Sequence, residues 1–568
     1  MNIAPLGPTL AQITQAAMPH LLLAPILLPM LTAALMLLLG EERARLKLAL
    51  NLLSTTAGLG VAVLLLAWAH QAGNTSALGV YLPGNWPAPF GIALALDRLS
   101  ALMLLLTSLV ALASILFAAA RWHRAGVHYH PLFQFQLMGL SGAFLTADLF
   151  NLFVFFEIML AASYGLLLHG SGKARVQAGL HYIAINLAAS SLFLIGVSML
   201  YGITGTLNMA DLARSIAQVA DSDRGLLHAA SAILAMAFLI KAAAWPLNFW
   251  LVPAYSAATA PVGALFSLMT KVGIYSLLRL WSLLFGSEAG PSAQFAADWL
   301  VACGMVTMAF GAIGMLGSQR LGHLAGFAAV LSSGTLIAAM GLGEHLLTAG
   351  LLYYLPSSTL AVAALFLLAD LIERWRNDGH SHAPYDDDDT PFLSADLQST
   401  QGLNLDEGES VLIGRVIPAA AAFLGLSFMV CTLVIAGLPP LSGFIGKFAM
   451  LTTLLNPLGL GGASSGQEPG ILGWTLLALL ISTGLMALIA LTRAGTRHFW
   501  GGHDRATPQL RVLEGAPIAL LLGTCIALTL GAGPAMSYTQ ATAHALHTPS
   551  TYIRAVMSAT PTPAPRAP

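Results

Sequence analysis

Four charged side chains lie inside long apolar runs of the sequence: Glu157, Lys241, Lys271 and Lys447. On insertion scales a charge at the bilayer centre costs about 2.5–3.5 kcal/mol, so four unpaired charges would cost on the order of 10 kcal/mol. Four charges that are so costly to insert are not expected in apolar runs by chance. The four residues therefore predict an ion or proton pathway. The alternative is a set of buried ion pairs that only hold helices together.

The only acid of this set has a natural partner among the lysines. Glu157 stands between aromatic and aliphatic residues in ADLFNLFVFFEIMLAASYG. Burial disfavours the charged form of an acid or an amine, and a nearby opposite charge offsets this effect. A proton that reaches one partner would release the other. We therefore consider a pair between Glu157 and Lys241, which the sequence alone leaves as a hypothesis.

Helix-breaking residues accompany two of the lysines. A proline inside a helix removes a backbone donor and clashes with the carbonyl four residues earlier. In lipid, the freed backbone groups need water or protein partners. A lysine beside a broken helix is typical of a midplane ion site. The predicted breaks lie at Pro246 and Pro253, after Lys241, and at Pro439 and Pro440, before Lys447.

Weaker candidates surround this set. Lys271 lies one apolar run after Lys241 and could link two half-channels. Hydroxyl groups within membrane helices can carry a water wire, but more often they bond the carbonyl one turn back. The secondary candidates are Asp148, as an ion entrance, His323 near a helix start, and the group Ser357, Ser358 and Thr359.

The elements that must position these residues are transmembrane helices. The 568 residues are 57% hydrophobic and 9% charged, whereas a soluble domain carries about 25% charged residues. Most of the surface must therefore face lipid, which a helix crosses in about 20 residues. We expect fourteen spans, with 416–454 as one broken span, and fifteen spans as the main alternative. The runs lie near 20–40, 46–69, 97–119, 131–147, 150–169, 178–204, 228–249, 256–285, 296–316, 322–343, 346–372, 416–454, 471–492 and 513–534.

The lysine and arginine distribution orients these spans. Fifteen of these residues fall on the side of the first loop, and six on the other side. The positive-inside rule makes the richer side the inside, which puts both termini outside.

Lys241 and Lys447 lie five spans apart, so their helices cross in opposite directions, as in an inverted repeat. We expect N-terminal helices in 1–130, five-helix repeats in 131–285 (spans 4–8) and 296–493 (spans 9–13), a last helix in 512–536 and a polar tail in 537–568.

Several other classes of protein are disfavoured. The three cysteines form no disulfide framework and no zinc spacing. The basic residues are dispersed and predict no nucleic-acid partner. We find no phosphate loop, nucleotide fingerprint or haem pair, so no cofactor and no metal is expected, and the chain is not expected to be an enzyme. The N-terminus lacks the charged region of a cleaved signal peptide. The acidic segment 377–412 is interpreted as a solvated insert on the inside.

Four segments carry a resemblance to a known family: FEIMLAASY, LIKAAAWPLNFWL, APVGALFSLMTKVGIYSLLR and GLPPLSGFIGKF. They resemble the antiporter-like subunits shared by respiratory complex I, membrane-bound hydrogenases and the Mrp (Pha) multisubunit cation/proton antiporters. The resemblance covers roughly residues 90–500. It implies fourteen helices, two inverted five-helix repeats and broken helices seven and twelve. It also implies a charge axis that maps onto Glu157, Lys241, Lys271 and Lys447.

Within this family the chain is most similar to the D subunit of the Mrp type, through HLLLAPILLPMLTAALMLLLG and TADLFNLFVFFEIMLAASYGLLLHG. The resemblance implies proton movement exchanged for Na⁺ or K⁺, partner subunits in a hetero-oligomeric complex, and a bacterial inner membrane. Complex I relatives often have a histidine in the area where Ser357, Ser358 and Thr359 stand here, and the acidic insert departs from the family pattern. The alternatives are a proton-pumping subunit of complex I or a hydrogenase, and a scaffold.

Overall fold

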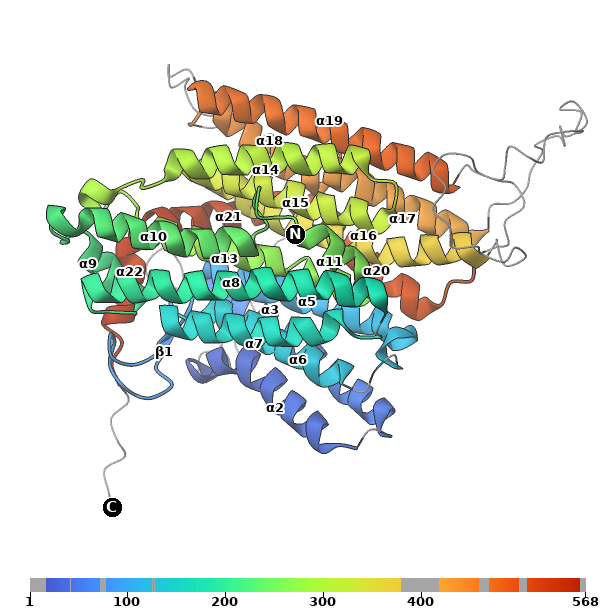
Figure 1. Ribbon diagram of the computed structural model, residues 1–568, viewed down its shortest axis with the longest axis horizontal. Helices are drawn as coiled ribbons and strands as arrows, with labels where there is room; N and C mark the ends of the chain where they lie inside the picture. The colour runs from blue at the N-terminus through green and yellow to red at the C-terminus, as the bar shows by residue number, and fades with distance from the viewer. Residues whose placement is uncertain are drawn as a thin grey trace, which may run out of the picture.

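The computed structural model describes residues 17–40, 42–71, 78–124, 126, 128–170, 172–378, 418–458, 469–499 and 508–561. Most of them form long helices that run side by side along the long axis of the molecule (Figure 1). Among the described residues, 13 helices are long and apolar enough to cross a membrane. The all-helical membrane fold is therefore confirmed. The acidic insert predicted at 377–412 lies almost entirely outside the described residues.

The first helices follow the predicted runs closely. The fourth run forms a helix of 17 residues, α6, which is not one of the 13 candidate spans. A short antiparallel pair of strands, β1 (Gly79–Tyr81) and β2 (Leu94–Leu96), connects the second and third spans. The helices are α2 (Ala24–Leu38), α3 (Ala44–Gln71), α5 (Arg98–Ala120), α6 (Tyr129–Leu145), α7 (Leu149–Leu167) and α8 (Lys173–Thr204).

Both predicted broken spans are interrupted. The run 228–249 stops being helical after residue 241 and resumes as a short helix, while 416–454 divides into helices of 18 and 14 residues. The helices of this part are α9 (Met209–Ile216), α10 (Asp221–Lys241), α11 (Leu251–Ala257), α12 (Ala260–Phe266), α13 (Met269–Leu284), α14 (Ala297–Gly317), α15 (Leu321–Gly341), α16 (His345–Asp378), α17 (Ala419–Ala436) and α18 (Ser442–Leu455).

The chain remains helical beyond the last predicted span. After α19 (Ile471–Phe499) and α20 (Val512–Leu530) come α21 (Ala532–His547) and α22 (Pro549–Met557), which occupy most of the expected polar tail. α21 packs along α16, and α22 packs against α9. The most buried helices are α13, α15 and α16, so these three form the centre of the bundle.

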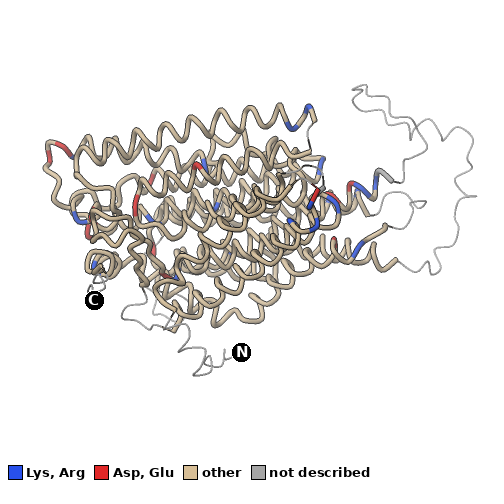
Figure 2. Tube along the Cα trace, turned by 90° about the horizontal axis from the view of Figure 1, so that it is seen from below, with Lys and Arg blue, Asp and Glu red and all other residues tan. Residues whose placement is uncertain are grey.

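Charged residues gather at the two ends of the bundle, and few lie between them (Figure 2). This distribution follows from the cost of placing a charge in hydrocarbon. The inverted relation between spans 4–8 and 9–13 stays a prediction.

Candidate functional site

Lys241 is the last residue of α10, at the edge of the first break. The backbone leaves the helix there, and Ala243 takes a positive φ of 56° before α11 begins at Leu251. Pro246 lies within this break, as predicted. Pro253 does not break a helix, because it occupies the first turn of α11, where a missing N–H removes no helical hydrogen bond.

The side chain of Lys241 is buried and binds a neutral partner. Its Nζ donates a hydrogen bond to Oδ1 of Asn186 on α8, at 3.0 Å. Four residues further along the same face of α8, the hydroxyl of Ser190 donates to the carboxylate of Glu157 on α7. Among the described residues, no ion pair within 4.0 Å joins Glu157 to Lys241. The hypothesised direct pair is therefore not formed: Lys241 and Glu157 each bond a different polar side chain of α8.

Lys271 connects the first break to the second half of the molecule. α13 packs closely on the end of α10, since a Cβ added to Gly273 would lie 2.6 Å from the backbone nitrogen of Ala242. Nζ of Lys271 donates to Oγ of Ser332 on α15 at 2.9 Å. That hydroxyl donates in turn to Oγ of Ser358 on α16, also at 2.9 Å. Sequence reasoning missed Ser332, although a buried Ser-Ser pair within an apolar span was a usable signal.

Lys447 lies at the second break, one turn inside α18. Its Nζ donates to the carbonyl oxygens of Ala436 (2.9 Å) and Ile435 (3.3 Å), which end α17. A cation is stabilised at a helix C-terminus, where the last carbonyls have no helical donor. Gly437 turns the chain with a φ of 77°, and an added Cβ would lie 2.4 Å from Cδ of Lys447. Pro439 and Pro440 follow, in the non-helical segment between α17 and α18.

The three hydroxyl-bearing residues that we singled out in α16 make different contacts. Ser357 shares a 2.7 Å hydrogen bond with Ser442 at the start of α18. Ser358 receives the bond from Ser332, whereas Thr359 bonds the carbonyl of Leu355 one turn back at 2.7 Å. The hydroxyl of Tyr354, also on α16, lies near the hydroxyls of Thr335, Ser332 and Ser358. α16 thus contacts both Ser332, the partner of Lys271, and α18, the helix that carries Lys447.

A cavity of about 620 Å³ lies at the end of α8, beside the first break. The side chains of Trp250, Tyr255 and Thr259, in and after this break, each bury a polar atom that has no protein partner. Buried polar atoms of this kind are usually hydrated. The polar residues lining the cavity include His323, together with His181, Arg320 and Glu373. Asp148, in contrast, caps α7 by accepting a 2.8 Å bond from the backbone of Asn151.

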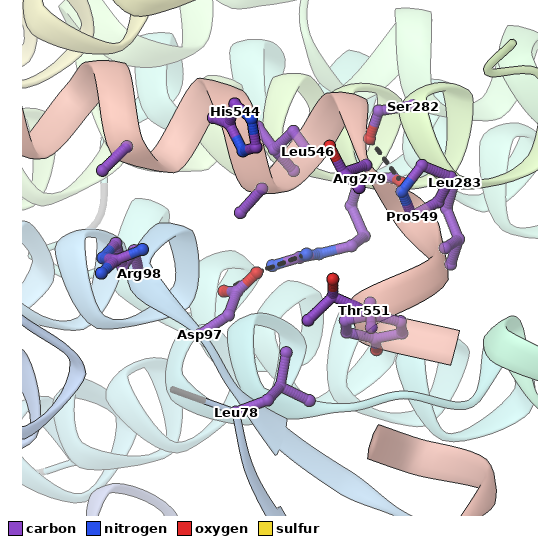
Figure 3. Close-up of a pocket in the computed structure, with 14 residues that line it drawn as sticks. Leu78, Asp97, Arg98, Arg279, Ser282, Leu283, His544, Leu546, Pro549 and Thr551 are labelled. Carbon is purple, nitrogen blue, oxygen red and sulfur yellow. Dashed lines mark hydrogen bonds and ion pairs between the residues drawn. The ribbon is translucent and has the colours of Figure 1, made fainter. Parts of the chain in front are cut away.

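A buried ion pair lies at the opposite end of α13. The guanidinium of Arg279 donates to both oxygens of Asp97, at 2.6 and 2.7 Å, across a small cavity beneath α21 and α22 (Figure 3). Asp97 also caps α5 through the backbone of Ser100. Burial alone would raise the pKa of Asp97, but the charge and hydrogen bonds of Arg279 hold this pKa below its usual value. Arg279 further stacks over the ring of Tyr552 in α22.

We expect this ion pair to hold α13 against the start of α5. In the Arg279→Leu variant, the carboxylate of Asp97 would remain buried and unpaired, which costs about 3–5 kcal/mol. The thermal unfolding temperature of the purified complex should fall clearly. The double variant Asp97→Asn with Arg279→Leu should recover much of the loss, because no buried charge remains. A single variant as stable as the wild type would contradict this role.

The fold and the buried charges at broken helices define a polytopic membrane protein of the antiporter-like class. The family described as the NADH:quinone oxidoreductase/Mrp antiporter transmembrane region matches residues 146–386. The probable K⁺/H⁺ antiporter D subunit of Rhizobium meliloti (strain 1021) is 52% identical over 95% of this chain and 98% of its own length. The Na⁺/H⁺ antiporter D subunit of Bacillus subtilis (strain 168) is 32% identical over 95% and 100%. The chain belongs to this family.

Solved structures agree with this assignment. A chain of the Mrp complex from Dietzia sp. DQ12-45-1b matches with a TM-score of 0.77 and 25% identity, over 95% of this chain and 100% of that chain. A chain of respiratory complex I from Thermus thermophilus matches with a TM-score of 0.69 over 95% and 100%. The identity to the latter is 22%, so that likeness concerns the fold alone.

Proposed function

We propose that this chain is the D subunit of a multisubunit antiporter that exchanges a monovalent cation, Na⁺ or K⁺, for protons. Its own part is to carry protons along Glu157, Lys241, Lys271 and Lys447. The observation that carries the proposal is the set of partners of the three lysines. Each is buried and bonded to an amide, a hydroxyl or backbone carbonyls, and none belongs to an ion pair of the described residues. Lysines that only lock helices would contact carboxylates.

The hydrogen bonds that link Lys271, Ser332 and Ser358, called here the central chain, suit stepwise proton transfer. A hydroxyl both donates and accepts, so Ser332 and Ser358 can pass a proton on by reversing their bonds. This chain of hydrogen bonds runs from Lys271 through Ser332 to Ser358. The preceding residue, Ser357, bonds Ser442 on α18, the helix that carries Lys447. Tyr354 adds a further hydroxyl to this cluster. A proton that leaves Lys271 would therefore meet hydroxyl groups on its way to Lys447.

The 620 Å³ cavity is the proposed access from the inside. Arg320 and the start of α8, which border it, lie on the side that the positive-inside rule makes cytoplasmic. The cavity ends near Tyr182, and α8 then presents Asn186 and Ser190 along one face toward Lys241 and Glu157. Water at the unpartnered atoms of the first break would complete this route. His323 would serve at the cavity mouth.

The proposed setting follows from the relatives. The chain would lie in a bacterial inner membrane with both termini outside, as one of several subunits of a membrane complex. It would need those partners for exchange, since the relatives are named as antiporter subunits. Asp148 is retained only as a candidate marker of an ion entrance, beside its capping of α7.

Everted membrane vesicles that contain the full complex test the function. After the vesicles are energised, NaCl or KCl is added and a pH-sensitive dye reports proton movement. Cation-driven proton movement in the wild type is the expected result, and comparison of the two salts identifies the cation. The absence of any cation-driven movement in an assembled wild-type complex would contradict antiport and point to a redox-linked proton pump.

Ser332 offers a sharp test of the central chain. In Ser332→Ala, the hydroxyl between Lys271 and Ser358 is lost, so the rate of cation-driven proton movement should fall about tenfold, which is less than the roughly 100-fold or larger effect of removing an acid–base group. Ser333→Ala is the matched control, because this neighbouring hydroxyl is equally buried but has no partner. Equal rates for the two variants would contradict the proposed role of Ser332.

A further inference from the structure

The cavity that lies beside Asp97 and Arg279, beneath α21 and α22, is large enough for a small ligand (Figure 3). Its volume is about 110 Å³, whereas one water molecule needs only about 10–15 Å³ of such space. His544, in the wall of the cavity, is exposed, so the cavity reaches the surface of the protein. The cavity therefore has room for a polyatomic ligand that enters from outside the bundle.

The wall of the cavity carries an excess of positive charge. Asp97 is the one acidic residue in the described part of the wall, and Arg279 neutralises it. The carboxylate of Asp97 accepts two hydrogen bonds from Arg279 and two from Ser100, so its lone pairs are occupied. Arg98, the first residue of α5, adds a charge that this pair does not balance, and an arginine stays charged in a protein. The cavity therefore attracts an anion and repels a cation.

Neutral groups of the wall have hydrogens to give to such an anion. Within the described part of the chain, the hydroxyls of Thr548, Thr551 and Tyr552 and the ring of His544 make no hydrogen bond. α22 begins at the cavity without a side-chain cap. The first N–H groups of a helix have no helical acceptor, and the helix dipole favours a negative charge beside them. Donors from α21 and α22 thus face the same space as the two arginines.

We infer that this cavity binds a phosphate group, carried either by a membrane lipid or by inorganic phosphate. A phosphate offers several acceptor oxygens in different directions, and a guanidinium is well suited to bind them. Arg98 begins the span α5, so the cavity lies where the hydrocarbon ends, at the level of lipid head groups. The bound group would connect α5 and α13 with α21 and α22. This inference goes beyond the proposed antiport and does not depend on it.

Thermal unfolding of the purified complex tests the site, after detergent exchange has removed loosely held lipid. The unfolding temperature is measured with sodium phosphate against sodium chloride, at equal Na⁺ and pH. It is also measured with phosphatidylglycerol against a diacylglycerol of the same acyl chains, which lacks the phosphate. A phosphate compound should raise the unfolding temperature, because a ligand of the folded state stabilises it. A shift with inorganic phosphate identifies a free-ion site, and a shift with the lipid alone identifies a head-group site.

Arg98→Gln removes the unbalanced charge from the wall. The ligand concentration that gives half of the shift should rise about tenfold, as expected when one hydrogen bond to a charged group is lost. Arg554→Gln is the matched control, because Arg554 lies in the same α22 that borders the cavity but is exposed and does not line it. This control should respond like the wild type. If Arg98→Gln does not assemble, Thr551→Val removes a lining hydroxyl and should also weaken the response.

The phosphorus that stays with each purified complex is measured as well, because a tightly held lipid gives no shift on addition. In that case the wild type and Arg554→Gln should retain phosphorus that Arg98→Gln loses. Two results would overturn the inference. One is a wild type with no phosphate-dependent shift and no more retained phosphorus than Arg98→Gln. The other is an equal response of the wild type and the assembled lining variants, which would place the phosphate elsewhere on the complex.

Discussion

Replacing Lys241 by alanine should abolish cation-driven proton movement in everted vesicles while the complex still assembles. Lys241 ends α10, contacts α8 through Asn186, and belongs to the proposed proton pathway. Alanine offers no group that can bind a proton at this point. The expected loss is on the order of 100-fold, as for removal of an acid–base group from a reaction that needs it. The dye assay measures the rate, and a native gel measures assembly.

Lys47→Ala is the matched control for this variant. Lys47 is also a buried lysine, at 3% exposure, but it lies in α3 and outside the proposed axis. It should retain most of the transport rate. If the assembled Lys241→Ala complex transports protons at the wild-type rate, Lys241 has only a structural role, and the proposed pathway must bypass the first break.

Lys447 should show the second large effect, and two substitutions separate its charge from its proton. In Lys447→Met, the carbonyl oxygens of Ile435 and Ala436 lose their donor, so we expect loss of transport and also a lower unfolding temperature. In Lys447→Arg, a positive charge remains near these carbonyls, but a guanidinium does not release its proton in a protein. This variant should be inactive too, yet more stable than Lys447→Met.

The vesicle assay and thermal unfolding together decide the role of Lys447. An active Lys447→Arg complex would show that the charge alone suffices and that no proton passes through this group. An active Lys447→Met complex would exclude Lys447 from the pathway altogether. Normal stability in Lys447→Met would instead show that the two carbonyls find another partner, such as water.

The sequence by itself determined the membrane-spanning elements and the identity of the buried charges. Hydropathy is a local and additive property, so runs such as 416–454 could be recognised without knowledge of their neighbours. The high cost of a charge in lipid likewise marked Lys241, Lys271 and Lys447, wherever their partners were. The break between α17 and α18 followed from Pro439 and Pro440 because a proline acts on its own helix.

Only the tertiary structure decided which groups these charges contact. Ser332 and Asn186 lie 61 and 55 residues from the lysines that they bind, so no local pattern links them. The contacts depend on how each helix is rotated and how closely it approaches its neighbour. Gly273 sets one such approach, because any side chain there would meet the backbone of α10. For the same reason the sequence suggested a direct pair between Glu157 and Lys241, whereas packing gave each of them a polar partner on α8.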